Sequence, residues 1–496
     1  MQSPLILALD IGTSSARAIL FDATAQPVPN CVAQIHYQPQ TTADGGLTFD
    51  AQVLLNNVVA AIDQLLQTAG PLAAQIGGVT SDTFVSNVLG VDATGEPVTP
   101  VYTYADTRNA PDAEALRQEL GHAGIAAAHE RTGCLVHTSY LPARFRWLAR
   151  TQPETLKAVA YWMSFGEYLL WKLLGQRVAS YSVASWTALL NRHTLTWDET
   201  WLAQLPIRAE QLSPLVDVTQ PLIGLLPRWA ERWPALKSVP WFPAIGDGAA
   251  ANLGSGCDNP ARVAMTIGTT GAMRVVLDPA LSTVPDGLWL YRVKKSQGLL
   301  GGATTEGGNL FAWLRETLQL PPIEQLEKQL AELPPAAHKL TILPFVSGER
   351  APGWNDKAKA SLLNFTLNTK PIDIVQAGLE AIAYRFAIIF ERIKPSLPPT
   401  GEFQIIANGG GLLSSPAWLQ IFADVLGQPI LTLAEKETTS RGIALLGLEQ
   451  LGVIQHTAEI APTTGLTYLP NAANHTIHRA ALEQQKYFYG QLHSLP

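Results

Sequence analysis

One segment near the start of the chain recurs in its second half without a gap. Residues 7–22 read LALDIGTSSARAILFD, and residues 263–278 read VAMTIGTTGAMRVVLD. Each copy places Ile-Gly-Thr between two apolar runs of strand length and ends on an aspartate. Apolar strands resemble one another easily, so chance similarity is the alternative, but the shared Gly-Thr turn is harder to repeat by chance. We interpret the pair as a duplicated strand–turn–strand unit, which predicts duplicated domains.

The length of the chain agrees with two domains. At 496 residues it exceeds what one hydrophobic core usually supports. Apolar runs of strand length alternate with longer helical patterns, which is typical of an α/β protein whose sheets are covered by helices. We place the boundary near Gly254, which gives domains of residues 1–253 and 254–496, and we expect the functional site in the cleft between them.

Composition argues against several classes of function. With 47% hydrophobic and 15% charged residues, nearly all of the chain is expected to fold. The formal net charge of -7 argues against a general binder of nucleic acid or anionic membranes. The three cysteines match no metal-binding spacing and fit a reduced cytosol, and no stretch has the pattern of a signal peptide or a membrane span. These features predict a cytoplasmic protein with a small-molecule substrate and no nucleic-acid or membrane partner.

Local patterns predict the first structural units. The runs LILALDI, ARAILFD and CVAQIHY are expected to form strands, and a helix is expected to begin at Asp50. The turn Asp-Ala-Thr-Gly at residues 92–95 predicts a hairpin between VLGVD and PVYTY. Pro111 and Pro416 each stand at the start of a helical pattern, where proline is favoured.

The repeated turns carry the first chemical signal. In each copy a strand ends and the chain reverses over Gly12 or Gly268, followed by hydroxylated residues. Glycine lets backbone N–H groups approach a phosphate closely, and hydroxyl groups add further donors. Turns also use such residues for conformational reasons alone, but two facing loops could clamp the phosphates of one nucleotide. The hydroxyl donors in question are Thr13, Ser14, Thr269 and Thr270.

Two aspartates stand beside glycine-rich segments. Asp10 ends the first strand, where a carboxylate beside phosphate oxygens could hold Mg²⁺ directly or through water, or could simply cap the turn. The second copy carries Thr266 at the matching position, so only the first half offers this acid. Asp247 lies in PAIGDGAAANLG, before a run of small residues that predicts a closely packed helix. It could accept the proton of a phosphoryl acceptor, and helix N-capping is an equal alternative.

A third glycine cluster spans residues 409–411, between the strand FQIIA and the helix that is expected to begin at Pro416. Adjacent glycines leave backbone open to a flat ligand such as adenine, and a mobile turn is the alternative. The sequence contains no Gly-Lys pair of a P-loop, no GxGxxG fingerprint and no DFG segment. Phosphate binding would therefore rest on turns and a metal ion.

These motifs, in this order, resemble those of the FGGY carbohydrate kinases over nearly the whole chain, and most closely those of the gluconate kinase branch. DIGTSSAR resembles the first phosphate loop of the family, TIGTTGAM the second, GDGAAANLG the segment with the catalytic base, and GGGLLSSPAWLQIFADVLG the adenosine segment. The resemblance implies an α/β fold of two actin-like (RNase-H-like) domains around a central cleft. It places sugar mainly on the N-terminal domain and ATP on the C-terminal one.

The resemblance also implies roles for single residues. Asp247 becomes the expected general base and Asp10 the expected Mg²⁺-associated carboxylate, while Arg17 would orient phosphates unless it is a solvent-facing strand residue. The residues expected to bind ATP are Gly12, Thr13, Ser14, Arg17, Gly268, Thr269, Thr270, Gly308, Gly410, Gly411 and Ser415.

The sugar side follows from further segments. YTYADTRNA resembles the Trp-x-Asp-x-Arg segment of the family with Tyr104 in place of tryptophan, and Ser86 stands where many relatives carry histidine. His137 and Arg144 could meet a carboxylate or hydroxyls, but a structural role is commoner for such residues near an apolar helix. The residues expected to bind substrate are Phe84, Ser86, Tyr104, Ser139 and Asp247.

The expected function is transfer of the γ-phosphate of Mg-ATP to a hydroxyl of a small sugar or sugar acid. Gluconate is preferred because the sequence outside the shared motifs is most similar to that branch, and xylulose or another ketopentose or polyol is the alternative. An actin-like ATPase without sugar kinase activity is an alternative of another class, but it would need no sugar-facing base such as Asp247. The resemblance also allows a homodimer, although no apolar stripe in the sequence predicts one.

Overall fold

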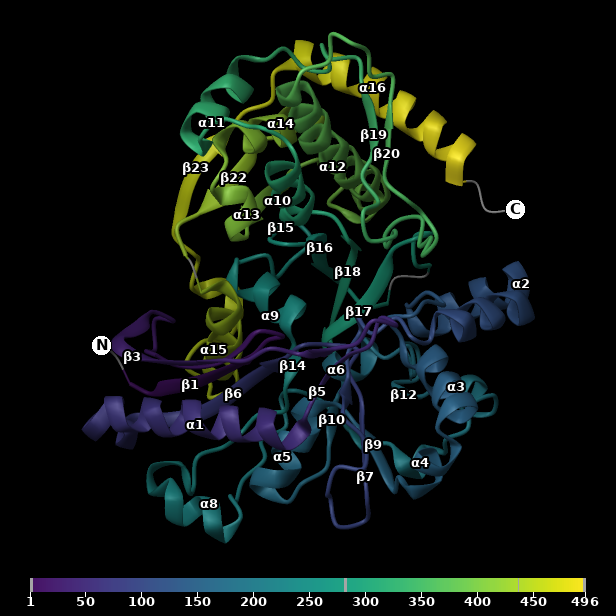
Figure 1. Ribbon diagram of the computed structural model, residues 1–496. Coiled ribbons are helices and arrows are strands. Elements are labelled where there is room, and N and C mark those ends of the chain that lie inside the picture. The colour runs from purple at the N-terminus through teal and green to yellow at the C-terminus, as the bar shows by residue number, and fades with distance from the viewer. Residues whose placement is uncertain (1–2, 281–282, 436, 494–496) are drawn as a thin grey trace.

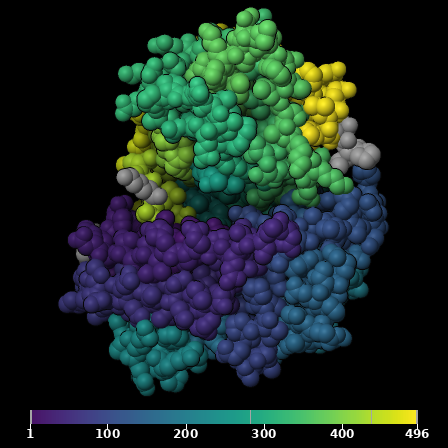
Figure 2. Space-filling model, in the orientation of Figure 1, coloured from purple at the N-terminus to yellow at the C-terminus, as the bar shows by residue number. Residues whose placement is uncertain are grey.

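The computed structural model describes residues 3–280, 283–435 and 437–493. It has two lobes, each built on one large sheet with helices packed around it (Figure 1). The space-filling surface is hollowed where the lobes meet (Figure 2). This is the two-lobed α/β architecture expected from the sequence.

The N-terminal sheet has the strand order β14-β6-β1-β2-β3. Strands β1, β2 and β3 are antiparallel neighbours, whereas β6 and β14 run parallel to β1. Because parallel strands end at the same edge, residues that follow β1, β6 and β14 gather there. The strands are β1 Leu5–Ile11, β2 Ser15–Phe21, β3 Pro27–His36, β6 Ile76–Thr83 and β14 Ile245–Gly246.

The C-terminal sheet repeats this pattern in the order β17-β18-β16-β15-β21-β22-β23. Strand β15 is antiparallel to β16 and parallel to β21, as β1 is to β2 and β6. The two copies of the repeated sequence therefore form equivalent central hairpins. The strands are β15 Arg262–Ile267, β16 Gly271–Leu277, β17 Trp289–Lys294, β18 Gln297–Thr304, β21 Gln404–Asn408, β22 Ile430–Leu433 and β23 Thr464–Tyr468.

Several helices begin where the sequence predicts. Helix α1 (Ala51–Ala69) is capped by Asp50, whose side chain accepts a hydrogen bond from the Val53 amide at 2.9 Å. Helices α2 (Ala110–Thr132) and α14 (Pro416–Leu426) have proline in their first turns. Within the described residues no helix is long and apolar enough to cross a membrane. The others, apart from α9 and α15, are α3 Leu141–Thr151, α4 Pro153–Ala158, α5 Phe165–Leu174, α6 Tyr181–Ser185, α7 Glu199–Leu202, α8 Pro227–Arg232, α10 Gly308–Thr317, α11 Ile323–Glu332, α12 Pro371–Ile393, α13 Gly410–Leu413 and α16 Ala472–His493.

The expected hairpin around residues 92–95 is present, but its two arms are joined by isolated antiparallel bridges and not by a regular ladder. The turn is present, because the amide of residue 95 donates to the Asp92 carbonyl at 3.1 Å. However, β7 pairs with β9, and β8 pairs with β5. Prolines at positions 97 and 100 lack the N–H donors that a regular ladder needs, so only isolated bridges join the two arms. The short strands are β4 Gln40–Thr41, β5 Leu47–Phe49, β7 Leu89–Val91, β8 Val101–Tyr102, β9 Tyr161–Met163, β10 Ala179–Ser180, β11 Leu190–Asn191, β12 Thr196–Trp197, β13 Leu215–Val216, β19 Thr341–Leu343 and β20 Ser361–Leu363.

Two helices, α9 (Asp247–Gly254) and α15 (Thr438–Gln450), pack against each other between the sheets (Figure 1). Their backbones approach so closely that a Cβ atom on Gly254 would lie 1.7 Å from the Thr438 carbonyl oxygen. A Cβ atom on Gly442 would lie 1.9 Å from the Ala250 carbonyl oxygen. The run of small residues after Asp247 thus forms the closely packed helix that the sequence predicts. Since α15 also packs on β1 and β6, this pair links the second half of the chain to the N-terminal sheet.

Candidate active site

Three aspartates meet at the edge where parallel strands end. Asp10 of β1 pairs in register with Asp82 of β6, and Ile245 of β14 pairs with Asp82 on its other side. Asp247 follows β14 directly and is the first residue of α9. The sheet therefore brings together two carboxylates that the sequence singles out and a third, Asp82, that it does not.

Burial sets the protonation of this cluster. It raises the pKa of Asp82 well above its usual range, and the nearby charges of Asp10 and Asp247 raise it further. Burial also raises the pKa of Asp10, while the charge of Arg17 opposes the shift. Burial raises the pKa of Asp247 to about 6, against the lowering effect of the Gly248 amide and of Arg274. A carboxylate with a pKa near 6 is suited to accept a proton near neutral pH.

The surroundings of Asp10 suit a metal-associated carboxylate. Its Oδ2 lies 3.8 Å from Nη1 of Arg17 and 3.5 Å from Oγ of Ser440, so both contacts are long. Arg17 instead donates to Glu437 at 2.8 Å, which joins β2 to the start of α15. Within the described residues, no group of three or more His, Cys, Asp or Glu side chains could hold a metal ion by itself. Mg²⁺ usually needs only one or two carboxylates beside substrate phosphates, and the loosely held Asp10 has that chemistry.

A cavity of about 150 Å³ lies beside this cluster, between the lobes. Four of the five residues expected to bind substrate line it, together with Thr266 and Thr270 of the second lobe. The exception is Phe84, which the structure places in the N-terminal core, with its ring centroid 5.6 Å from that of Phe49. Its amide donates to the Ile11 carbonyl at 2.9 Å, so it supports the first loop from behind. The four lining residues are Ser86, Tyr104, Ser139 and Asp247.

The polar atoms in the cavity have defined partners. Ser86 adopts a left-handed conformation with φ 52°, and its hydroxyl donates to the Trp186 carbonyl at 2.6 Å. Ser139 Oγ lies 3.1 Å from Nδ1 of His137. Asp247 Oδ1 accepts from the Gly248 amide at 2.7 Å, which leaves its other oxygen without a hydrogen bond from the described chain. Hydroxyl lone pairs and a carboxylate oxygen therefore remain available to a ligand.

Sequence reasoning missed part of the cavity wall. Arg274 of β16 and Arg350, which follows β19, both line it, and so do Trp186 and Tyr291, whose rings stack with centroids 3.8 Å apart. A charged residue inside the otherwise apolar run AMRVVL is a signal that could have identified Arg274. No comparable local pattern marks Arg350, because it lies in an irregular segment.

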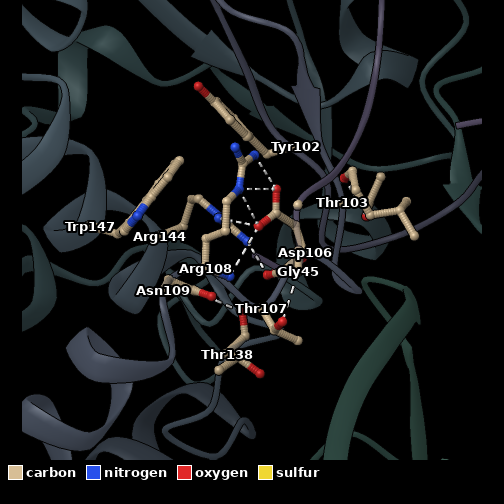
Figure 3. A network of polar contacts seen from close by, with 12 residues as sticks. Gly45, Tyr102, Thr103, Asp106, Thr107, Arg108, Asn109, Thr138, Arg144 and Trp147 are labelled. Carbon is tan, nitrogen blue, oxygen red and sulfur yellow. Dashed lines mark hydrogen bonds and ion pairs between the residues drawn. The ribbon is translucent and has the colours of Figure 1, made fainter. Parts of the chain in front are cut away.

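His137 and Arg144, for which the sequence allowed either a ligand-binding or a structural role, contact carboxylates of the protein itself. His137 Nε2 lies 2.5 Å from Oδ1 of Asp356, which comes from the other lobe. Arg144 Nη1 lies 3.1 Å from Oδ1 of Asp106, and Arg108 contacts the same carboxylate (Figure 3). Both candidates are buried and neither lines the cavity, so their structural interpretation fits the geometry.

On the nucleotide side, two glycine-containing segments converge on the second loop. The Gly308 amide donates to the Gly268 carbonyl at 2.8 Å, and a Cβ atom on Gly411 would lie 3.1 Å from that same oxygen. A Cβ atom on Gly410 would meet nothing within 4 Å, so its backbone faces open space. The side chains that follow Gly12 and Gly268 are exposed, and they are Thr13, Ser14, Thr269 and Thr270.

Ser415 differs from the other expected nucleotide residues, because its hydroxyl is already engaged. It accepts from the Trp418 amide at 3.2 Å, as the N-cap of α14, and donates to Glu327 at 2.6 Å. The side chain is buried in these contacts.

Comparison with known proteins agrees with this geometry. The model of the N-terminal domain of the FGGY family of carbohydrate kinases matches residues 5–254 of this chain. The model of the C-terminal domain of that family matches residues 263–450. Gluconokinase of Bacillus subtilis is 25% identical over 480 residues, which cover 93% of this chain and 91% of that protein.

Two solved structures share the fold over nearly their full length. Gluconate kinase from Lactobacillus acidophilus superposes with a TM-score of 0.89 at 24% identity, covering 98% of each chain. Xylulose kinase from Lactobacillus acidophilus superposes with a TM-score of 0.88, also at 24% identity and 98% of each chain. The family models, the two-lobed fold and the interlobe carboxylates all agree with one family. The chain belongs to the FGGY family of carbohydrate kinases, which are phosphotransferases with an alcohol group as acceptor.

Proposed function

We propose that this kinase transfers the γ-phosphate of Mg-ATP to a hydroxyl of a small sugar or sugar acid, with gluconate as the preferred acceptor and Asp247 as the general base. One observation carries the proposal: Asp247, with a pKa raised to about 6, opens into an interlobe cavity that is also lined by Thr270 of the second Gly-Thr turn. A base and a phosphate-binding loop facing one cavity are what phosphoryl transfer to an alcohol requires.

In this mechanism Asp247 accepts the proton of the attacking hydroxyl as the new bond forms. The backbone amides and hydroxyls of residues 13–14 and 269–270 donate to the phosphates, and Arg17 orients them. The amides of Gly12 and Gly268 instead close their turns, each with a carbonyl at 3.0 Å. Asp10 holds Mg²⁺, which would offset negative charge on the phosphates when bound. The tight contact between α9 and α15 keeps Asp247 fixed relative to both sheets, and closure of the lobes excludes water from the cavity.

The acceptor cavity takes lining residues from both halves of the chain: Ser86, Tyr104 and Ser139 from the first, and Thr266, Thr270, Arg274 and Arg350 from the second. On the family likeness we assign sugar binding mainly to residues 1–253 and ATP binding mainly to residues 254–496. Gluconate is preferred because a gluconokinase and a gluconate kinase are among the relatives. Xylulose is the second candidate, on the likeness to a xylulose kinase. A homodimer stays a prediction.

The test is a screen of phosphorylated products over gluconate, xylulose, other pentuloses, glycerol and polyols, with ADP release measured in parallel. We expect Asp247→Asn to lower turnover by orders of magnitude while ATP binding persists, and Asp92→Asn, in an exposed turn, to behave as the wild type. Near-normal turnover of Asp247→Asn would refute the assigned base. ATP hydrolysis that no sugar stimulates, without any phosphorylated product, would favour an actin-like ATPase instead.

A further inference from the structure

Two arginines line the acceptor cavity without an acidic partner. Within the described residues, neither Arg274 nor Arg350 has a carboxylate within ion-pair distance, and Nε of each is buried without a hydrogen bond. The recorded side-chain hydrogen bond of Arg274 is a long one, 3.5 Å from Nη1 to Oγ1 of Thr266. The guanidinium carbon of Arg350 lies 5.7 Å from the ring centroid of Tyr104 and 5.9 Å from that of Trp354. Both guanidiniums therefore keep donors free for a ligand.

The buried arginines elsewhere in the described chain have partners. Arg144 shares the carboxylate of Asp106 with a second arginine (Figure 3), and Arg385 contacts Glu349. Arg292 and Arg441 have no carboxylate of a described residue within ion-pair distance, but each donates to two backbone carbonyls at 2.6–2.8 Å.

The side chains of Arg274 and Arg350 are half-buried, with Nε of each fully shielded. A guanidinium that is partly withdrawn from water without such partners loses hydration that no described residue replaces. The two unpaired cations are thus found where an anion from outside the protein could offset that loss.

The position of Arg274 relative to the base is also defined. A Cβ atom on Gly248 would lie 3.2 Å from Nε of Arg274, so glycine after Asp247 leaves room for the guanidinium beside the start of α9. Burial lowers the pKa of Arg274 to about 10, and Arg350 contributes to that lowering as a like charge, while Asp247 opposes it. Arg274 is still protonated at neutral pH.

The charge of the cavity follows from its lining. Arg274 and Arg350 face one lining carboxylate, Asp247, and the other lining residues are neutral, so the cavity has one positive charge in excess when Asp247 is ionised. A neutral sugar would leave that excess uncompensated. A carboxylate would compensate it, and arginine binds carboxylates with two parallel, charge-assisted hydrogen bonds.

We propose that Arg274 and Arg350 bind the carboxylate of an aldonate, so that the kinase selects sugar acids over neutral sugars and polyols of the same size. This inference rests on the proposed kinase function and names the residues that set its specificity. Hydroxyls of the acid would meet Ser86, Ser139 and Asp247, and its carbon chain would lie beside the wall of stacked rings that includes Trp186 and Tyr291. The transferring phosphoryl group is the other anion that these guanidiniums could bind. The test distinguishes binding of the acceptor carboxylate from binding of the phosphoryl group.

The test compares D-gluconate with D-gluconamide, which has nearly the same shape but no charge. With Mg-ATP saturating, we expect the wild type to show a kcat/KM at least 100-fold higher for the acid. Arg274→Met and Arg350→Met should each reduce that preference by about tenfold to 100-fold, mainly through KM for gluconate, while kcat/KM for gluconamide stays within a few-fold. Arg→Lys variants, which keep the charge but lose the forked geometry, should lie between. Calorimetric titration with gluconate and with gluconamide in the absence of nucleotide provides a second reading that needs no turnover.

Each outcome has a distinct meaning. Equal use or equal binding of acid and amide by the wild type overturns the inference and leaves the kinase proposal intact. A fall in kcat by the same factor for both acceptors in the Met variants shows that the guanidiniums serve the phosphoryl group, and it also overturns the inference. If no acceptor is phosphorylated, the proposed function fails, and nucleotide-free binding still decides whether the arginines select an acid. Circular dichroism of each variant separates loss of binding from loss of folding.

Discussion

Turnover should fall on acidification through pH 6, because protonation of Asp247 removes the base. Asp247 ordinarily would titrate near 3.8, and its burial, with a contribution from the charge of Asp10, raises the pKa to about 6. The Gly248 amide and the charges of Arg274 and Arg350 act in the opposite direction but do not cancel the effect of burial. The base is therefore ionised above pH 6 and increasingly protonated below it.

The size of the effect follows from this pKa. Below pH 6 each further unit should lower kcat/KM about tenfold, so that activity at pH 5 is about one-tenth of the plateau. With an ordinary aspartate pKa of 3.8, activity at pH 5 would stay close to the plateau. The assay is initial-rate ADP release at constant ionic strength between pH 5 and 8, with phosphorylated product quantified at each point and Mg²⁺ saturating.

The variant Asp247→Asn is the control that shows whether the loss of activity at acidic pH comes from residue 247. Bound nucleotide also titrates in this range, but its protonation does not depend on residue 247. The residual activity of Asp247→Asn should therefore lack the acidic limb with a midpoint near pH 6 and keep only the pH dependence that bound nucleotide imposes. An acidic limb of the same midpoint in Asp247→Asn, or a wild-type midpoint below about 4.5, would refute the reasoning.

Three further predictions concern the framework of the site, each measured as a urea unfolding midpoint with activity in parallel. Gly254→Ala should destabilise the protein by about 3 kcal/mol, because its Cβ atom would lie 1.7 Å from a backbone oxygen of α15; an unchanged midpoint would contradict the close helix contact. Asp106→Ala should cost about 3–5 kcal/mol, since it leaves the Arg144 guanidinium buried without its carboxylate, whereas Glu154→Gln on the exposed surface should leave the midpoint unchanged. Glu349→Ala should cost a similar amount, through the loss of its contacts with Arg385 and with the hydroxyl of Tyr489 at 2.6 Å. Glu349→Ala should also weaken the selection of sugar acids, because the backbone next to it carries Arg350. Unaltered selectivity would show that Glu349 supports the fold without positioning Arg350.

Much of the fold could be predicted from short stretches of sequence. The repeated Gly-Thr hairpins, the cap at Asp50 and the small-residue helix after Asp247 depend on turn chemistry and periodicity within a few residues, and all three are present in the structure. The hairpin at residues 92–95 is less regular than expected, because local turn residues do not determine that β7 forms its ladder with β9. Strand partners are chosen by packing over long sequence separations, where local propensity has little influence.

The sequence by itself determined which residue types were available for phosphoryl transfer, including the glycine turns and the aspartates at positions 10 and 247. Only the tertiary structure decided that Asp82 lies between those aspartates, that the side chain of Phe84 is turned into the core, and that two unpaired arginines face the acceptor cavity. The physical reason is that charge, burial and hydrogen-bond partners in this site come from strands and loops of both lobes. A carboxylate acquires a pKa near 6 only from all of these neighbours together.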